Sequence, residues 1–166
     1  MTDNCGAVCP VGGERPLTDG ETALVRSIFG TAIDCSAVML RRKKWFPLQP
    51  RNTLMAPCGH IHFHPKGSNY CDDFAHAPLD EQGLFVHEMT HVWQTQVHGK
   101  YYLPLRRHPF CRYGYVLRPG QPLQRYGIEQ QAEIVRHAFL LRRGWKLAGV
   151  SDARAYDALV NFAGAR

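Results

Sequence analysis

The stretch Asp80-Glu-Gln-Gly-Leu-Phe-Val-His-Glu-Met-Thr-His-Val-Trp-Gln-Thr-Gln-Val-His98, followed by Gly99, decides how this chain is interpreted. Asp80 is a good N-cap and Gly99 a good helix end, so we predict a helix over residues 80–98. Apolar residues recur at spacings of three and four, which predicts a buried face. These residues are Leu84, Phe85, Val86, Met89, Val92, Trp93 and Val97.

The centre of this helix carries His87-Glu-Met-Thr-His91. On a helix, His87 and His91 lie one turn apart on one face, where two imidazoles can bind the same Zn²⁺ ion. Glu88 is then placed to act as general base toward a water whose pKa zinc lowers to roughly 7. The alternative interpretation is an amphipathic helix with two partly exposed histidines.

A catalytic zinc needs a third protein ligand, and a later segment offers one. Glu129, in Ile128-Glu-Gln-Gln-Ala-Glu133, lies 38 residues after His91 on another predicted helix. Glu133 is one turn from Glu129 and faces the same way, so it can accept a hydrogen bond from a ligand histidine. We predict Glu129 as the ligand and Glu133 behind it, and the main alternative exchanges their roles.

The combination of His-Glu-x-x-His with Glu-x-x-x-Glu resembles the gluzincin branch of zinc metallopeptidases. In that branch the first acidic residue of the second motif binds zinc and the last orients a histidine. The resemblance therefore implies a ligand role for Glu129 and an orienting role for Glu133, where aspartate is commoner in the branch.

The segment Gly83–Gln94 is also similar to small bacterial metallopeptidase domains with a His-Glu-Leu/Met-Thr-His-Val-x-Gln signature. Such domains occur in secreted toxins and in Vgr-related proteins associated with type VI secretion. The strand His60-Ile-His-Phe63 also looks like the one that precedes their zinc helix, and the resemblance covers about residues 17–143. It implies a zincin-like fold and a bacterial effector with a secretion-system partner or a cognate inhibitor.

Other segments complete an expected α+β architecture. Thr18 and Glu21 form a capping-box pattern that starts a helix ending near Gly30. Further helices are predicted over about 126–141 and 151–163, and strands over 36–41 and 59–64, the second as an edge strand beside the zinc helix. We expect residues 1–16 to be an irregular lead-in and residues 17–166 to form one zincin-like domain with a small mixed sheet.

The composition limits the other classes of function. The 166 residues fit one domain and contain no apolar run long enough to span a membrane. The N-terminus lacks the apolar core of a signal peptide, which predicts synthesis in the cytoplasm and export by a specialised secretion system. The net charge of +6 comes from scattered groups, and we expect no nucleic-acid binding. Six cysteines leave the disulfide state open.

Two groups of residues remain without a selected role. His60, His62 and His64 alternate on the second predicted strand and are interpreted as exposed polar residues, a second metal site or an anion site. Zincins often stabilise the oxyanion with a further side chain. The candidates here are Tyr126, His137, His108 and Tyr115.

We therefore expect a zinc-dependent peptidase that acts on a peptide or protein substrate. Two other hypotheses remain. The chain could be a non-catalytic binding module or adaptor of a secretion system that retains the fold, or a basic nucleic-acid-binding domain.

Overall fold

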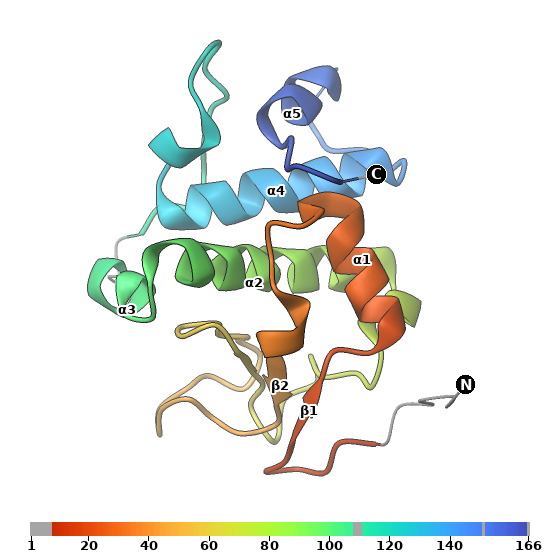
Figure 1. The fold of residues 1–166 in the computed structure, drawn as a ribbon, viewed down its shortest axis with the longest axis vertical. Coiled ribbons are helices and arrows are strands. Elements are labelled where there is room, and N and C mark those ends of the chain that lie inside the picture. The colour runs from red at the N-terminus through yellow and green to blue at the C-terminus, as the bar shows by residue number, and fades with distance from the viewer. Residues whose placement is uncertain (1–7, 108–110, 151, 166) are drawn as a thin grey trace.

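The structure, a computed structural model, describes residues 8–107, 111–150 and 152–165. This part of the chain contains three short strands and five α-helices (Figure 1). In chain order these elements are β1 (Glu14–Pro16), α1 (Asp19–Phe29), β2 (Met39–Arg41), β3 (Ile61–His62), α2 (Leu79–His98), α3 (Tyr102–Arg106), α4 (Ile128–Arg142) and α5 (Arg154–Leu159). The prediction of an α+β fold with a small sheet followed by helices is confirmed.

The long helix α2 is the centre of the molecule. Figure 1 shows α4 running along one side of α2, while the sheet lies on the opposite side. The two helices approach closely at Gly83, where a Cβ atom would lie 3.0 Å from the side chain of Leu140. Because partners cover α2 on more than one side, every residue from 85 to 95 is buried, rather than only one face.

The boundaries of α2 differ slightly from the prediction. The helix begins at Leu79 after Pro78, and the side chain of Asp80 makes no capping hydrogen bond. Asp80 instead lies in the first turn, where its charge still interacts favourably with the helix dipole. Gly99 ends the helix as expected, at a φ of 97°.

The sheet is mixed and its order is β1-β2-β3. β1 runs antiparallel to β2, and β2 runs parallel to β3 with Leu40 opposite Ile61. Beyond β3, Met55 forms an antiparallel bridge with His62, so the segment near residue 54 borders the sheet on that side. The strand predicted over 59–64 is therefore not the edge strand of the sheet, because residues near Met55 lie beyond it.

The capping box of α1 is confirmed. Thr18 Oγ1 accepts a hydrogen bond from the Glu21 N–H at 3.0 Å, and Glu21 Oε2 accepts one from the Thr18 N–H at 2.9 Å. Gly30 ends the helix with a φ of 54°. A Cβ atom at this position would lie only 2.0 Å from Ala163 O. Only glycine fits this position, because the backbone is left-handed and closely approached.

Stacked aromatic rings connect the sheet to α2. The ring centroids of Phe63 and Phe74 lie 5.7 Å apart, and those of Phe74 and Phe85 lie 4.8 Å apart. All three side chains are almost fully buried. This stack holds the sheet beneath the helix that carries the histidine motif.

Several segments differ from the sequence expectations. The strand predicted over 36–41 begins only at Met39, after a 3-10 helix at Cys35–Ala37, and the strand predicted over 59–64 is limited to Ile61–His62. Glu14–Pro16, at the end of the expected irregular lead-in, pair as β1, and Tyr102–Arg106 form α3, where no helix was predicted. The last helix is shorter than the predicted 151–163 and starts after Ala153, while Ser151 lies outside the described residues. Among the described helices, none is long and apolar enough to cross a membrane.

Candidate metal centre

His87 and His91 point from α2 toward α4. Their ring centroids lie 5.0 Å apart, as expected for residues one helical turn apart. Only 5% of His87 and 1% of His91 is exposed, so the two imidazoles lie inside the α2–α4 interface rather than on an open surface. This burial contradicts the interpretation of the pair as partly exposed histidines on an ordinary amphipathic helix.

Glu129, in the first turn of α4, faces both rings. Its Oε2 atom lies 3.4 Å from His87 Nε2 and 3.2 Å from His91 Nε2. The three residues offer ligand atoms that all lie within 4.8 Å of one another, and each residue is buried. Two imidazole nitrogens and a carboxylate oxygen in this arrangement could hold a metal ion.

The outer nitrogen of each ring is held by a second side chain. His87 Nδ1 lies 2.7 Å from Glu133 Oε1, and His91 Nδ1 lies 2.8 Å from Gln94 Oε1. Gln94 Nε2 donates to Ile128 O and to Gln131 Oε1, so its Oε1 atom is left to accept from His91. Both imidazoles therefore carry a proton on Nδ1 and direct Nε2 toward Glu129.

The electrostatics of the cluster keep Glu129 ionised. Burial alone would raise the pKa of Glu129, but its hydrogen bonds with His87 and His91 hold that pKa well below the usual range. Burial likewise opposes the charged form of His87, yet its bonds to Glu129 and Glu133 raise the pKa of this imidazole to about 9. The carboxylate is thus available as a ligand at neutral pH.

Glu88 lies beside the cluster with an unused oxygen atom. The residue is 4% exposed, and its buried Oε2 atom has no hydrogen-bond partner among the described residues. Glu88 lines a cavity of about 390 Å³ together with His87 and the segment Asn52–Leu54. A water or substrate in this cavity would supply the missing partner.

Arg107 and Tyr113 complete the rim of this cavity, and neither was selected as a site residue from the sequence. Arg107 Nε lies 3.0 Å from Glu129 Oε1, the oxygen that does not face His87 or His91. The Tyr113 ring lies roughly parallel to that of His87, with centroids 6.3 Å apart. Neither residue has a periodic relation to the motif. Gln94 did carry a signal, because it lies three residues after His91 on the same helix.

The candidates for an oxyanion-stabilising side chain do not line this cavity. The Tyr126 hydroxyl accepts a hydrogen bond from the Arg118 N–H at 2.9 Å, and Tyr115 lies 2.5 Å from His137 Nδ1. His108 lies outside the described residues. The described candidates are therefore occupied elsewhere, and Arg107 is the cationic residue that reaches Glu129 itself.

The histidines of the segment 60–64 are not part of the group formed by His87, His91 and Glu129. His62 is 6% exposed, and its Nδ1 atom lies 3.2 Å from Lys43 O, so it is a core residue rather than an exposed one. Among the described residues, His87, His91 and Glu129 form the only group placed to hold a metal. This leaves the second-metal-site interpretation of His60, His62 and His64 without support.

The described cysteines at positions 9, 35, 58 and 71 are free thiols. Burial raises the pKa of the Cys35 thiol and raises that of Cys71 to about 12. Both therefore stay protonated near neutral pH and are poor nucleophiles. Cys5 lies outside the described residues.

Comparisons with known proteins point to one relative. No family model matches the chain. The chain is 40% identical over 155 residues to the type VI secretion system spike protein VgrG2b of Pseudomonas aeruginosa. This match covers 89% of the chain but only 15% of the spike protein, so the chain corresponds to a small part of that longer molecule.

A solved structure corresponds to the same part. The effector domain of Pseudomonas aeruginosa VgrG2b superimposes with a TM-score of 0.73 and is 36% identical in sequence. The superposition covers 95% of this chain and 89% of that domain. At this identity and coverage, the likeness extends to the whole domain rather than to the histidine motif alone.

Proposed function

The chain belongs to the family of the VgrG2b effector domain, and we propose that it is a zinc-dependent peptidase delivered as a type VI secretion effector. One observation carries the catalytic part of this proposal. His87, His91 and Glu129 converge inside the α2–α4 interface, and the unpartnered Glu88 carboxylate lies beside them at a cavity. A structural cluster would have no need for an unsatisfied buried acid next to three potential ligands.

The donor set fits zinc. Two imidazole nitrogens and one carboxylate oxygen are the ligands of one common class of catalytic zinc site, which leaves a fourth position for water or substrate. The Nδ1 hydrogen bonds of both histidines present Nε2 to the ion, and Glu129 is already ionised. Bound zinc would act as a Lewis acid and lower the pKa of a coordinated water to roughly 7.

The residues of the chain would then divide the remaining work. Glu88, with its free Oε2 atom, accepts the proton of the attacking water and passes it to the leaving amine. Glu133 and Gln94 fix the orientation of His87 and His91. Arg107 holds the second oxygen of Glu129, which leaves the first directed toward the histidines.

The segment before β3 offers a place for an extended substrate. Met55 bonds to His62 with both its N–H and its C=O, and successive residues of a strand point these groups to opposite sides. Leu54 therefore directs its own backbone groups away from the sheet, and it lines the cavity beside Glu88. Among the described residues Leu54 has no backbone hydrogen bond, so a substrate strand could add there.

Delivery follows from the family. A type VI spike relative supports export through that secretion system after synthesis in the cytoplasm, with a component of the system as partner. The substrate is then a peptide or protein reached after export, and a cognate inhibitor would protect the producing cell. The zincin-like description of the fold rests on the same helix, third ligand and flanking strand.

Metal analysis and one substitution test the proposal. Purified protein should contain about one zinc per chain and cleave members of a proteome-derived peptide library. Glu88→Gln should retain the metal and reduce cleavage by about 10²- to 10⁴-fold, the usual contribution of a general base. Glu81→Gln, in the first turn of the same helix, is the matched control and should leave both unchanged.

Three outcomes would count against the proposal. If protein with its three ligand residues intact binds no metal, the proposed metal centre is wrong. If Glu88→Gln cleaves at the wild-type rate, Glu88 is not the general base. Metal-loaded protein that cleaves no peptide would favour the alternative of a non-catalytic adaptor.

A further inference from the structure

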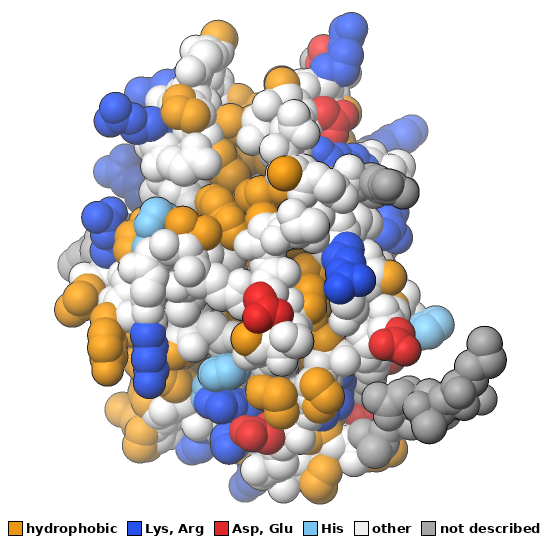
Figure 2. Space-filling view, in the orientation of Figure 1, with side chains coloured by type: hydrophobic (Ala, Val, Ile, Leu, Met, Phe, Trp, Pro, Cys, Tyr) orange, Lys and Arg blue, Asp and Glu red, His pale blue; other side chains and the backbone are white. Residues whose placement is uncertain are grey.

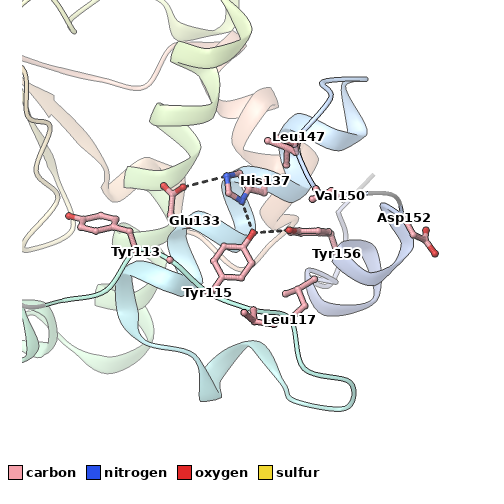
Figure 3. Close-up of a pocket in the computed structure, with 13 residues that line it drawn as sticks. Tyr113, Tyr115, Leu117, Glu133, His137, Leu147, Val150, Asp152 and Tyr156 are labelled. Carbon is pink, nitrogen blue, oxygen red and sulfur yellow. Dashed lines mark hydrogen bonds and ion pairs between the residues drawn. The ribbon is translucent and has the colours of Figure 1, made fainter.

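A second and larger cavity lies next to the candidate metal centre. It has a volume of about 710 Å³, within the range of roughly 300–1,000 Å³ in which proteins hold small ligands. Figure 3 shows its walls: the segment from Tyr113 to Leu117 on one side, residues Leu147–Val150 and Tyr156 on the other, and α4 with Glu133 and His137 between them.

The two cavities adjoin one another. Glu133 and Tyr113 line both the 390 Å³ cavity at Glu88 and the 710 Å³ cavity. Along α4, Glu133 and His137 lie about 6 Å and 12 Å from the ligand candidate Glu129, at a rise of about 1.5 Å per residue. An extended peptide advances about 3.3 Å per residue, so the cavity lies roughly two to four residues from the scissile bond.

Apolar side chains form one part of the walls of the larger cavity. Val116, Leu117, Leu147 and Val150 line it. Figure 2 shows hydrophobic side chains gathered in the hollow between the segment 111–122 and α5, where a neighbouring cavity is lined by Leu117, Pro119, Pro122 and Leu159. Leu147 is partly exposed there and does not pack into the main core, so its apolar surface remains available. An unoccupied apolar surface of this kind marks a site for an apolar partner.

The polar groups of the wall already bond to one another. The Tyr115 hydroxyl lies 2.5 Å from His137 Nδ1 and 2.9 Å from the Tyr156 hydroxyl, and His137 Nε2 lies 3.5 Å from Glu133 Oε2 (Figure 3). An apolar group that enters the cavity therefore leaves none of these side chains without a partner.

The charges that line the cavity exclude an acidic ligand. Neither lysine nor arginine is among the lining residues that the structure describes. The two carboxylates that line it are engaged, Glu133 with His87 and Asp152 with Arg154. A negatively charged side chain would find two carboxylates and neither lysine nor arginine among these lining residues, so charge disfavours an acidic occupant.

We infer that this cavity is the subsite that selects the substrate: it accepts a large apolar or aromatic side chain located two to four residues from the bond that is cleaved. The inference rests on the proposed peptidase function. It adds a class of substrate, peptides with an apolar residue at one fixed position.

Binding of a small probe tests the cavity without relying on hydrolysis. The probe is N-acetyl-phenylalaninamide, titrated into ¹⁵N-labelled protein as purified, with N-acetyl-aspartamide as the charged comparison. Saturable shifts should appear at Tyr115, Val116 and Val150, with at least tenfold weaker binding of the aspartyl amide. Burial of one such side chain is worth about 10- to 100-fold in affinity.

A matched pair of variants localises the effect. Leu147→Asp places a charge in the cavity and should weaken binding of the phenylalanyl amide at least tenfold. Leu48→Asp makes the same change at a residue that is 85% exposed and lines none of the cavities described above, and it should leave binding unchanged. Equal binding of the two amides, or equal behaviour of the two variants, would overturn the inference.

Mapping of cleavage sites in the peptide library separates this inference from the proposed function. An apolar residue enriched at one fixed position, and lost in Leu147→Asp, is the expected result. Metal-dependent cleavage without any such position overturns the inference and leaves the peptidase proposal intact. Binding of the amide without any metal-dependent cleavage overturns the peptidase proposal and the substrate assignment with it.

Discussion

Two glutamates of this protein, Glu21 and Glu129, are buried to nearly the same degree, with 0% and 1% of each residue exposed. Each also faces an arginine from a neighbouring segment, Arg15 and Arg107 respectively. The chain itself supplies hydrogen-bond partners for both carboxylate oxygens of Glu21. Around Glu129, the neighbouring groups leave room for a bound ligand to interact. The difference distinguishes a buried charge that stabilises the fold from one that serves a site.

The Glu21 cluster is closed. Its Oε1 accepts from Arg15 Nη2 at 2.8 Å and from the Phe74 N–H at 3.0 Å, and its Oε2 accepts from Arg15 Nη1 at 2.8 Å and from the Thr18 N–H at 2.9 Å. Arg15 also donates to the Tyr70 hydroxyl and to Cys71 O. This network joins β1, α1 and the turn at residue 74, with the buried charges fully paired.

The Glu129 cluster is open. Its partners include two histidines, which can release their protons, whereas an arginine stays charged in proteins. Arg107 is 25% exposed at its side chain, against 9% for Arg15, so water still reaches it. The neighbouring Glu88 oxygen has no partner among the described residues. An open cluster can therefore change its charge and its ligands without unfolding the protein.

The largest expected effect separates the two clusters by stability. Glu21→Gln leaves the buried Arg15 without its counter-charge, which should cost about 3–5 kcal/mol. Glu129→Gln should cost less than about 2 kcal/mol in protein stripped of metal with a chelator, because the histidines can become neutral. Urea unfolding of both variants measures the difference. Equal losses in the free energy of unfolding would mean that the two clusters do not differ in their contribution to stability.

A smaller effect is expected at the second carboxylate of the open cluster. Glu133→Ala removes the acceptor of His87 Nδ1, so the ring loses its fixed orientation and some of its basicity as a ligand. Zinc affinity should fall about 10- to 100-fold, as for other partners of metal ligands. Competition with a chromophoric chelator measures this, and Glu81→Ala, on the first turn of α2, is the control. Unchanged affinity in Glu133→Ala would mean that this contact does not serve the metal.

The smallest effect concerns pH and the histidines of the two regions. Burial lowers the pKa of His62 to about 4, whereas the pKa of His87 is raised. A group with a lowered pKa in the folded state stabilises the protein above its unfolded pKa, about 6.5, and this stability is lost as the pH falls through about 4. His62 should therefore contribute about 1–2 kcal/mol at pH 7 that disappears in acid, after allowance for solvent.

The variant His62→Asn tests this contribution. Asparagine can still donate a hydrogen bond to Lys43 O, as His62 Nδ1 does, but it does not titrate. Its free energy of unfolding should vary less than that of the wild type between pH 6.5 and pH 4. His64→Asn, on the same segment, should retain the wild-type dependence. A wild-type pH profile in His62→Asn would show that another group causes the acid sensitivity.

Much of the candidate site was predictable because its geometry is local. The spacing of His87 and His91 places both rings on one helical face, and the spacing of Glu129 and Glu133 does the same on the next helix. The capping box of Thr18 and Glu21 was predictable for the same reason, since its two hydrogen bonds lie within one turn. The full burial of α2 was not, because it depends on what packs against each face.

The sequence by itself determined which residues share a helical face, because helix periodicity fixes the relation between positions three or four apart. It therefore specified the histidine pair, the two glutamates and the caps. Only the tertiary structure decided that Glu129 faces both Nε2 atoms while Glu133 lies behind His87, and that Arg107 reaches the second oxygen of Glu129. These contacts join segments far apart in the chain. Their geometry depends on how α2, α4 and the loops pack, and packing leaves no periodic trace in the sequence.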